Sequence, residues 1–280
     1  MLKQRFITAV ILVVALLASL WGLPLLGMAA VFALVMAVAS WEWSAMSGFP
    51  ALAQRSVAVV IAVLAMAGLG MSVGLFEQAM DWERVKGIMH LACLWWAIAL
   101  LWVMSYPASA RLWSHRVALV VMGTLTLLPT WLAFTSLRAL EQGVLWILFL
   151  IGIVAAADIG AYFFGRAFGR SKLAPAVSPG KSWAGFWGGQ LTAALLVAGL
   201  WSVWPGGMPF GLAACIAIAL TTALASVLGD LLESAVKREI GIKDSGTILP
   251  GHGGVMDRID SLCAAAPVFT LGFILAGGAA

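Results

Sequence analysis

The chain has 280 residues, of which 63% are hydrophobic and 10% charged, with a mean hydropathy of +1.04 and a net charge of +4. A soluble domain of this length needs more polar residues to cover its surface, so the composition excludes an ordinary soluble protein. The positive charge does not indicate a nucleic-acid partner, because the cations lie in short runs between apolar segments, where they serve as topology signals and anion sites.

The chain begins with a basic and then apolar stretch, MLKQRFITAVILVVALLASLWG, that resembles a signal peptide. No small-x-small cleavage site follows Leu20, so we interpret the stretch as an uncleaved first span. Apolar stretches long enough to cross a bilayer as helices recur to the end of the chain. They predict an all-α polytopic membrane protein with about nine transmembrane helices, at residues 6–23, 25–46, 56–75, 87–104, 117–135, 143–164, 184–204, 209–229 and 262–279.

Lysine and arginine divide unequally between the two sides of this arrangement. Three of the 16 fall on one side, namely Arg84, Lys86 and Arg138. The other 13 are Lys3, Arg5, Arg55, Arg111, Arg116, Arg166, Arg170, Lys172, Lys181, Lys237, Arg238, Lys243 and Arg258. Because cytoplasmic loops carry the excess of these residues, the amino terminus and both long charged segments are predicted to face the cytoplasm.

The cysteines and the paired glycines are assigned to packing. The cysteines stand apart among apolar neighbours with no metal-ligand spacing, which argues against disulfides and a thiolate site; they are Cys93, Cys215 and Cys263. GxxxG spacing joins Gly165 to Gly169 and Gly185 to Gly189, which indicates close helix packing.

The first polar segment, residues 158–185, reads DIGAYFFGRAFGRSKLAPAVSPGKSWAG. If the sixth predicted helix continues past the lipid, Arg166 and Arg170 share one of its faces, where they repel unless an anion lies between them or water screens them. Pro175 and Pro179 end the helix, and SPGKS then offers hydroxyls, backbone amides and an ammonium to a phosphate. It is not a P-loop, because Pro175 stands where that motif needs glycine and no strand is expected before it. A lipid-headgroup anchor is the alternative interpretation.

The second polar segment, residues 230–261, holds half of the acids in the chain. Within 31 residues lie six of the 12, namely Asp230, Glu233, Glu239, Asp244, Asp257 and Asp260. Four cations lie among them, Lys237, Arg238, Lys243 and Arg258, and PGHGG lets the backbone approach a bulky anion. Oxygen ligands suit Mg²⁺, and Lys and Arg suit phosphate, so the mixture indicates metal-assisted phosphoryl or nucleotidyl transfer.

Other interpretations remain open for single residues of this segment. A solvated loop that caps a helix would account for Asp260 or Glu239 alone. His252 is equally suited to act as a base, as a phosphate donor or as a loop hydrogen bonder. Two further ionisable residues, Glu42 and His90, lie apart from both polar segments and are placed near span ends.

The stretch SAVKREIGIKDSGTILPGHGGVMDRID, residues 234–260, resembles the signature of the phosphatidate cytidylyltransferases, or CDP-diacylglycerol synthases. DIGAYFFGRAFGRSKL and SPGKS also resemble that family, so the resemblance is direct over about residues 155–261. One departure is Ala184, which stands where members often have an acid. The resemblance implies that CTP and phosphatidate give CDP-diacylglycerol and pyrophosphate in phospholipid biosynthesis, with Mg²⁺ or another divalent cation, at the cytoplasmic membrane surface.

The resemblance also implies roles for particular residues. As metal ligands it implies Asp230, Asp257 and, third, Asp260. As catalytic residues it implies Asp230, Asp257, Lys237 and Arg258. As substrate-binding residues it implies Ser178, Lys181, Ser182, Arg238, Lys243, Asp244, His252, Gly253 and Gly254. The expected partners are CTP, phosphatidate and membrane lipids, with a homodimer as one candidate assembly.

Residues 141–280 are therefore expected to form the catalytic region, and residues 1–140 a scaffold of helices with a pocket for acyl chains. A transporter for an anionic substrate is one alternative, but it predicts ionisable residues deep in several spans. A CTP-dependent lipid kinase is another, and the signature over residues 234–260 argues against it.

Overall fold

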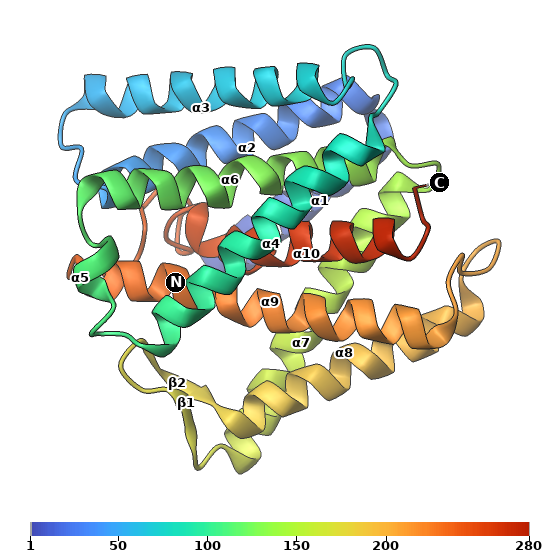
Figure 1. Cartoon of the computed structure of the whole chain (residues 1–280). Helices are drawn as coiled ribbons and strands as arrows, with labels where there is room; N and C mark the ends of the chain where they lie inside the picture. Colours follow the sequence, from blue (N-terminus) through green and yellow to red (C-terminus); the bar gives the residue numbers. More distant parts are fainter. Residues whose placement is uncertain (1, 280) are drawn as a thin grey trace.

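The computed structural model describes residues 2–279, with side chains from residue 6 onward, and is almost entirely helical (Figure 1). The elements, in chain order, are α1 (Leu2–Gly22), α2 (Leu25–Met46), α3 (Leu52–Ser72), α4 (Trp82–Met104), α5 (Ala110–Trp113), α6 (Arg116–Ala139), α7 (Gly143–Phe168), β1 (Lys172–Ala174), β2 (Ser178–Ser182), α8 (Trp183–Val203), α9 (Leu212–Glu239) and α10 (Met256–Leu275). In the part of the chain that the structure describes, eight helices are long and apolar enough to cross a membrane, and Phe6–Gly22 of α1 is a shorter apolar stretch. Each predicted span is thus a helix, which confirms an all-α polytopic membrane protein.

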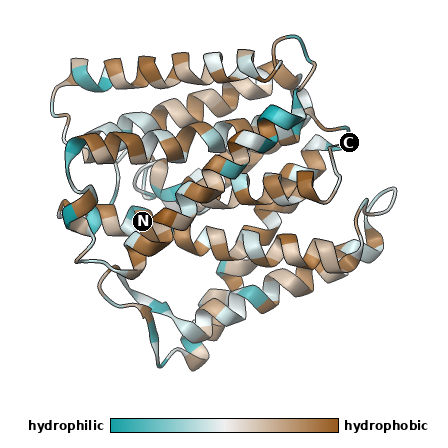
Figure 2. Ribbon diagram, in the orientation of Figure 1, coloured by the Kyte–Doolittle hydropathy of each residue, from teal (hydrophilic) through white to brown (hydrophobic). Residues whose placement is uncertain are grey.

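The long helices run back and forth between two ends of one bundle (Figure 1). At the left of the view lie the β1–β2 hairpin, the last turn of α9, the loop 240–255 and the first turn of α10. We call this end the polar end. In Figure 2, hydrophilic residues gather near the helix ends and on the hairpin, while the middles of the helices are mainly hydrophobic. This distribution is the one expected for helices whose middles face lipid or each other.

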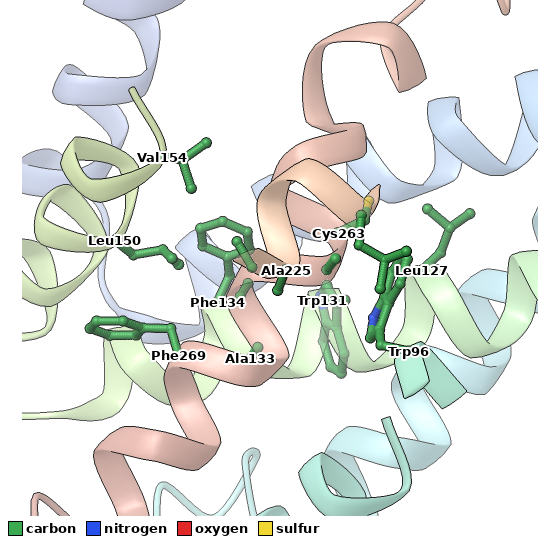
Figure 3. Packing of buried hydrophobic residues seen from close by; sticks show 14 of the residues in the cluster. Trp96, Leu127, Trp131, Ala133, Phe134, Leu150, Val154, Ala225, Cys263 and Phe269 are labelled. Carbon is green, nitrogen blue, oxygen red and sulfur yellow. The ribbon is translucent and has the colours of Figure 1, made fainter. Parts of the chain in front are cut away.

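The centre of the bundle is packed with large apolar side chains from several helices. Figure 3 shows Trp131 and Phe134 of α6 in one cluster with Phe269 of α10, among residues that are all less than 9% exposed. Two hydrogen bonds tie α6 to its neighbours: Thr130 Oγ1 donates to the Cys263 carbonyl at 2.9 Å, and Trp131 Nε1 donates to the Ala29 carbonyl at 3.0 Å. This core fixes α10 against α6, and therefore fixes the position of the helix that begins at the polar end. All three cysteines are free, as predicted.

Glycines bring α7 and α8 into close contact. A Cβ added at Gly185 would lie 2.8 Å from the Ala161 carbonyl oxygen, and one at Gly189 would lie 2.7 Å from that of Ala157. Real Cβ atoms do not approach so closely, so the two backbones meet only because these positions lack side chains. The packing role predicted for this glycine pair is confirmed.

Two predictions for the first polar segment are wrong. α7 ends at Phe168, so Arg170 lies beyond the helix and does not share a helical face with Arg166. The chain then forms an antiparallel pair of strands, β1 with β2, where no strand was expected. These strands have three and five residues, too short for a pattern of alternating side chains to reveal them. The absence of a P-loop still follows from Pro175.

The helices that carry the second polar segment are longer than predicted. α9 continues to Glu239 rather than ending at residue 229, and α10 begins at Met256 rather than at residue 262. The prediction followed hydropathy, which marks the part of a helix in lipid and not the polar turns that continue beyond it. The longer helices place Lys237 and Asp257 on rigid elements that face each other.

Candidate active site

Lys237, in the last turns of α9, connects two carboxylates. Its Nζ donates to Glu233 Oε2 at 2.7 Å and to Asp257 Oδ1 at 2.6 Å. The side chains of Lys237, Glu233 and Asp257 are 10%, 0% and 6% exposed. Buried charges are stable only when paired and hydrogen-bonded, so this arrangement depends on all three members. It holds the end of α9 against the start of α10.

Asp257 has donors on its other oxygen as well. Asp257 Oδ2 accepts the backbone N–H of Ser245 at 2.9 Å and that of Gly254 at 2.8 Å. Gly253 has a φ of +82°, and a Cβ there would lie 2.7 Å from Asp257 Oδ2. A side chain would strain that backbone and crowd the carboxylate, which explains glycine at this position. Asp257 therefore folds the loop 240–255 around itself.

Lys181 and Asp230 bring the two polar segments together. Lys181 Nζ, on β2, lies 2.6 Å from Asp230 Oδ2, on α9, with side chains that are 25% and 35% exposed. Ser234 Oγ also donates to Asp230 Oδ1, at 3.2 Å. Asp230 thus remains partly open to solvent while it anchors the hairpin.

Several acids surround this ion pair. The charges of Asp230 and Asp260 repel each other, and the charge of Asp260 also acts on Glu233. Gly229 lets α9 approach α10 at this point, because a Cβ there would collide with the Asp260 carbonyl oxygen. Glu233 Oε1 is buried and has no hydrogen-bond partner among the described residues. A bound cation would stabilise carboxylates that repel each other and a buried carboxylate oxygen that lacks a donor.

The fit of a divalent cation can be judged from these acids. Within residues 2–279, no three His, Cys, Asp or Glu side chains already surround one metal position. Mg²⁺ is commonly held by one or two carboxylates together with substrate phosphates, and Asp230 with Asp260 could supply such a pair. Asp257 has different partners from Asp230, namely Lys237, Ser245 and Gly254. The predicted meeting of Asp230 and Asp257 at one metal stays a prediction.

The other predicted residues lie around the same end of the bundle. Arg238 Nε donates to the Val177 carbonyl at 3.4 Å, and Arg258 Nε to the His252 carbonyl at 3.0 Å. Ser178 begins β2, and its pairing partner is Ala174. Their predicted roles toward substrate stay predictions.

Four predicted substrate-binding residues differ in whether their polar groups are free to bind a ligand. Ser182 Oγ accepts the Gly185 N–H at 3.2 Å and so caps α8. His252 Nδ1 is buried, and no side chain from residue 6 to 279 and no described backbone group forms a hydrogen bond with it. Lys243 is exposed on the loop, as is its neighbour Asp244. Lys243 and Asp244 are thus open to an incoming ligand.

Two acids of this site were not predicted. Asp158, on α7, lies within the electrostatic reach of Lys181 and Asp230. Glu42, on α2, is 2% exposed and accepts the backbone N–H groups of Val255 and Met256 at 3.0 and 2.7 Å. Glu42 lies near the end of α2, as predicted from the sequence, but its contact with the second polar segment was not predicted. An acid inside an apolar helix was the available signal, since such a residue is costly unless it has partners.

Comparison with known proteins gives consistent matches. A model described as the cytidylyltransferase family matches residues 3–275. The chain is 40% identical over 270 residues to the phosphatidate cytidylyltransferase of Pseudomonas aeruginosa, covering 96% of each chain. It is 38% identical over 288 residues to that of Haemophilus influenzae, covering 96% of this chain and 98% of the relative. A third relative of the same name, from Brucella melitensis, is 48% identical over 144 residues, about half of each chain.

Proposed function

We propose, from the premise that the chain belongs to the cytidylyltransferase family, that it makes CDP-diacylglycerol from CTP and phosphatidate at the polar end of the bundle. It is a membrane-embedded nucleotidyltransferase of phospholipid synthesis. The observation that carries the location of the site is the ion pair between Lys181 and Asp230, because it joins the only two segments rich in phosphate-binding chemistry.

In the reaction, an oxygen of the phosphatidate phosphate forms a bond to the α-phosphorus of CTP. The bond from that phosphorus to the bridging oxygen breaks, and pyrophosphate leaves with the bonding electrons. The attacking oxygen is already anionic at neutral pH, so no strong base is needed. The protein must instead hold two mutually repelling anions together and stabilise the leaving group.

Cations at the polar end suit these tasks. Lys181 and Lys237 are held by their carboxylate partners, whereas Lys243 on the loop and Arg258 in the first turn of α10 are exposed. Lys and Arg bind phosphate oxygens by charge-assisted hydrogen bonds. We assign the exposed pair to the triphosphate of CTP, which arrives from water, and Lys181 to the lipid phosphate.

The carboxylates of Asp230 and Asp260 would hold a divalent cation, for which Mg²⁺ is the expected ion. When bound, it would neutralise charge on the phosphates of CTP. Asp257 would act beside it by keeping Lys237 and the loop in place, through the contacts described above.

A cavity of about 400 Å³ adjoins the polar end and suits the acyl chains of phosphatidate. It lies between α4, the hairpin, α8 and α9, and its lining includes Val177, Leu228 and Leu231. Val177 accepts a hydrogen bond from Arg238, and Leu231 follows Asp230 in α9. A lipid with its chains here would have its phosphate beside the ion pair. A second cavity, of about 530 Å³, lies between α2, α3 and α6 within the expected scaffold.

We place the protein in a bacterial inner membrane with the polar end toward the cytoplasm, where CTP is made. The excess of Lys and Arg at this end supports that orientation. A single cysteine introduced at Lys243, in a cysteine-free background, should react with an impermeant maleimide only after the inner membrane is permeabilised. A cysteine at a periplasmic position, the control, should react in intact cells. Labelling of the Lys243 position in intact cells would indicate the opposite orientation.

The function is tested with purified protein in detergent, labelled CTP and Mg²⁺. Phosphatidate should yield a labelled CDP-lipid, and a polyprenol should yield none. Transfer of the terminal phosphate of CTP to an alcohol would indicate the lipid kinase, and no lipid product would favour a transporter. Asp257→Asn should abolish the CDP-lipid without preventing membrane insertion, whereas Asp81→Asn, at the opposite end of the bundle, should be active.

A further inference from the structure

We propose that Glu42 is a positioning residue of the active site, which reaches from α2 to hold Ser245 and the first turn of α10 so that Asp257 keeps its contacts with Lys237. The proposal rests on the proposed function for its effect on turnover, and on the contacts alone for its effect on structure. It gives the second helix of the chain a direct part in a site built otherwise from residues 158–261.

Glu42 receives hydrogen bonds on both carboxylate oxygens. Its Oε1 accepts the Val255 N–H at 3.0 Å, and its Oε2 accepts the Met256 N–H at 2.7 Å and the Ser245 hydroxyl at 3.4 Å. The residue is 2% exposed. Among the side chains from residue 6 to 279, no lysine, arginine or histidine forms an ion pair with it. Among the described side chains, its contacts are therefore with N–H and O–H dipoles.

The start of α10 is a site that attracts a carboxylate. The first N–H groups of a helix have no partners within the helix, and its dipole places positive charge there. Val255, which precedes α10, has no side-chain oxygen and forms no side-chain cap. Glu42 supplies the missing acceptor from more than 200 residues away in sequence. It is thus a long-range cap of the helix that carries Asp257 and Asp260.

Two glycines make room for this carboxylate. A Cβ at Gly246 would lie 2.5 Å from Glu42 Oε1, and a Cβ at Gly254 would lie 2.7 Å from the same oxygen. A side chain at either position would push the carboxyl group away from the helix. The loop is thus shaped on both sides to receive Glu42.

Ser245 connects Glu42 to Asp257. The Ser245 hydroxyl donates to Glu42, while its backbone N–H donates to Asp257 at 2.9 Å. The two acids also share neighbouring backbone donors, since Gly254 N–H binds Asp257 and Val255 N–H binds Glu42. A change in the position of the Glu42 carboxylate would therefore move the donors that hold Asp257.

The test is Glu42→Gln, which keeps the size of the side chain but replaces one acceptor oxygen by an NH₂ group facing backbone N–H groups. We expect kcat to fall about 10- to 100-fold, because a displacement of about 1 Å at a reacting centre lowers the rate by up to about that much. The KM for CTP should change less than about 3-fold. Glu42→Asp, which keeps two acceptor oxygens, should retain more activity than Glu42→Gln. Ser245→Ala, which removes one donor, should have a smaller effect in the same direction.

Hydrogen exchange gives a readout independent of turnover. Glu42→Gln should speed exchange of the backbone amides of residues 245–257 and leave α4 and α6 unchanged. The control is Ser44→Ala, also on α2 and 4% exposed, whose hydroxyl binds only the nearby Trp41 carbonyl. It should match the parent in both measurements.

The proposal is overturned by parental exchange in residues 245–257 of Glu42→Gln, or by faster exchange throughout the bundle, which would mark a general packing role. Equal activity of Glu42→Gln and the parent would also overturn it. A parent protein that makes no CDP-lipid would instead contradict the proposed function, and the exchange measurement would still decide whether Glu42 holds the loop.

Discussion

Lys237 donates to Asp257 across 2.6 Å and so joins the last turns of α9 to the first turn of α10. The contact spans 20 residues of sequence and encloses the whole loop 240–255. Because Glu233 binds the same ammonium, one buried cation balances two carboxylates. An ion pair therefore joins the two ends of the loop.

Replacing Lys237 by methionine should destabilise the protein strongly. Removal of one partner leaves buried carboxylates without their cation, which costs about 3–5 kcal/mol. Thermal unfolding in detergent measures the loss, and CDP-lipid synthesis should fall to background. Lys86→Met is the control, because its ion pair with Glu83 is exposed and contributes about 0–1 kcal/mol. Equal unfolding temperatures for the two variants would contradict this assignment.

The spans could be predicted because lipid imposes a length and a composition on every helix that crosses it. The same reasoning could not find the ends of α9 or α10, since Lys237 and Asp257 lie on polar turns that hydropathy assigns to loops. The contact of Glu42 with the second polar segment could not be predicted for a different reason. Its partners are backbone N–H groups of residues 255 and 256, and backbone donors leave no trace in residue types.

The joining of the two polar segments was predictable in outline but not in detail. The excess of Lys and Arg predicts that both polar segments lie on one side of the membrane, and both contain residues suited to bind phosphate. The pairing of Lys181 with Asp230 depends on the β1–β2 hairpin, which turns the lysine toward α9. A hairpin of such short strands is specified by its contacts with the bundle more than by its own sequence.

Exchanging the charges of Lys181 and Asp230 distinguishes two roles of Asp230, as an anchor of the hairpin and as a metal ligand. Lys181→Asp alone places two acids together and should loosen the hairpin, which faster hydrogen exchange in residues 172–182 would reveal. Adding Asp230→Lys restores opposite charges and should restore protection. Activity should stay below about 1% of the parent, because an ammonium cannot replace a carboxylate as a metal ligand. If the double variant regains activity, Asp230 has only an anchoring role.

Asp260→Asn should weaken the response to Mg²⁺. Loss of one carboxylate from the pair removes charge and an oxygen ligand, so the Mg²⁺ concentration for half-maximal activity should rise at least about 10-fold. EDTA should abolish activity in the parent. Asp81→Asn, in an exposed ion pair with Arg84, is the control and should leave the Mg²⁺ response unchanged. An unaltered response in Asp260→Asn would remove this residue from the cation site.

Filling the cavity beside the hairpin should affect the lipid substrate selectively. Leu228→Trp adds bulk to the lining of the 400 Å³ cavity, so we expect the KM for phosphatidate to rise about 10-fold, with little change in that for CTP. Leu195→Trp is the control, because Leu195 is 63% exposed on α8 and does not line the cavity. If the KM values for CTP and phosphatidate rise together, the cavity does not hold the acyl chains.

Gly229 should tolerate no side chain, because it is the point where α9 meets α10. A Cβ at this position would collide with the Asp260 carbonyl oxygen and lie 3.2 Å from the Ala264 Cβ. Gly229→Ala should therefore destabilise the protein by about 1–3 kcal/mol and reduce activity about 10-fold or more, because Asp230 and Asp260 move apart.

The control is Gly199→Ala, since Gly199 lies in α8 with nothing within 4 Å of an added Cβ. Alanine is the better helix former, so that variant should be as active as the parent and more stable by about 0.5–1 kcal/mol. Thermal unfolding and CDP-lipid synthesis, measured on both variants, separate the two effects. Full activity in Gly229→Ala would mean that the spacing of Asp230 and Asp260 does not matter to the reaction.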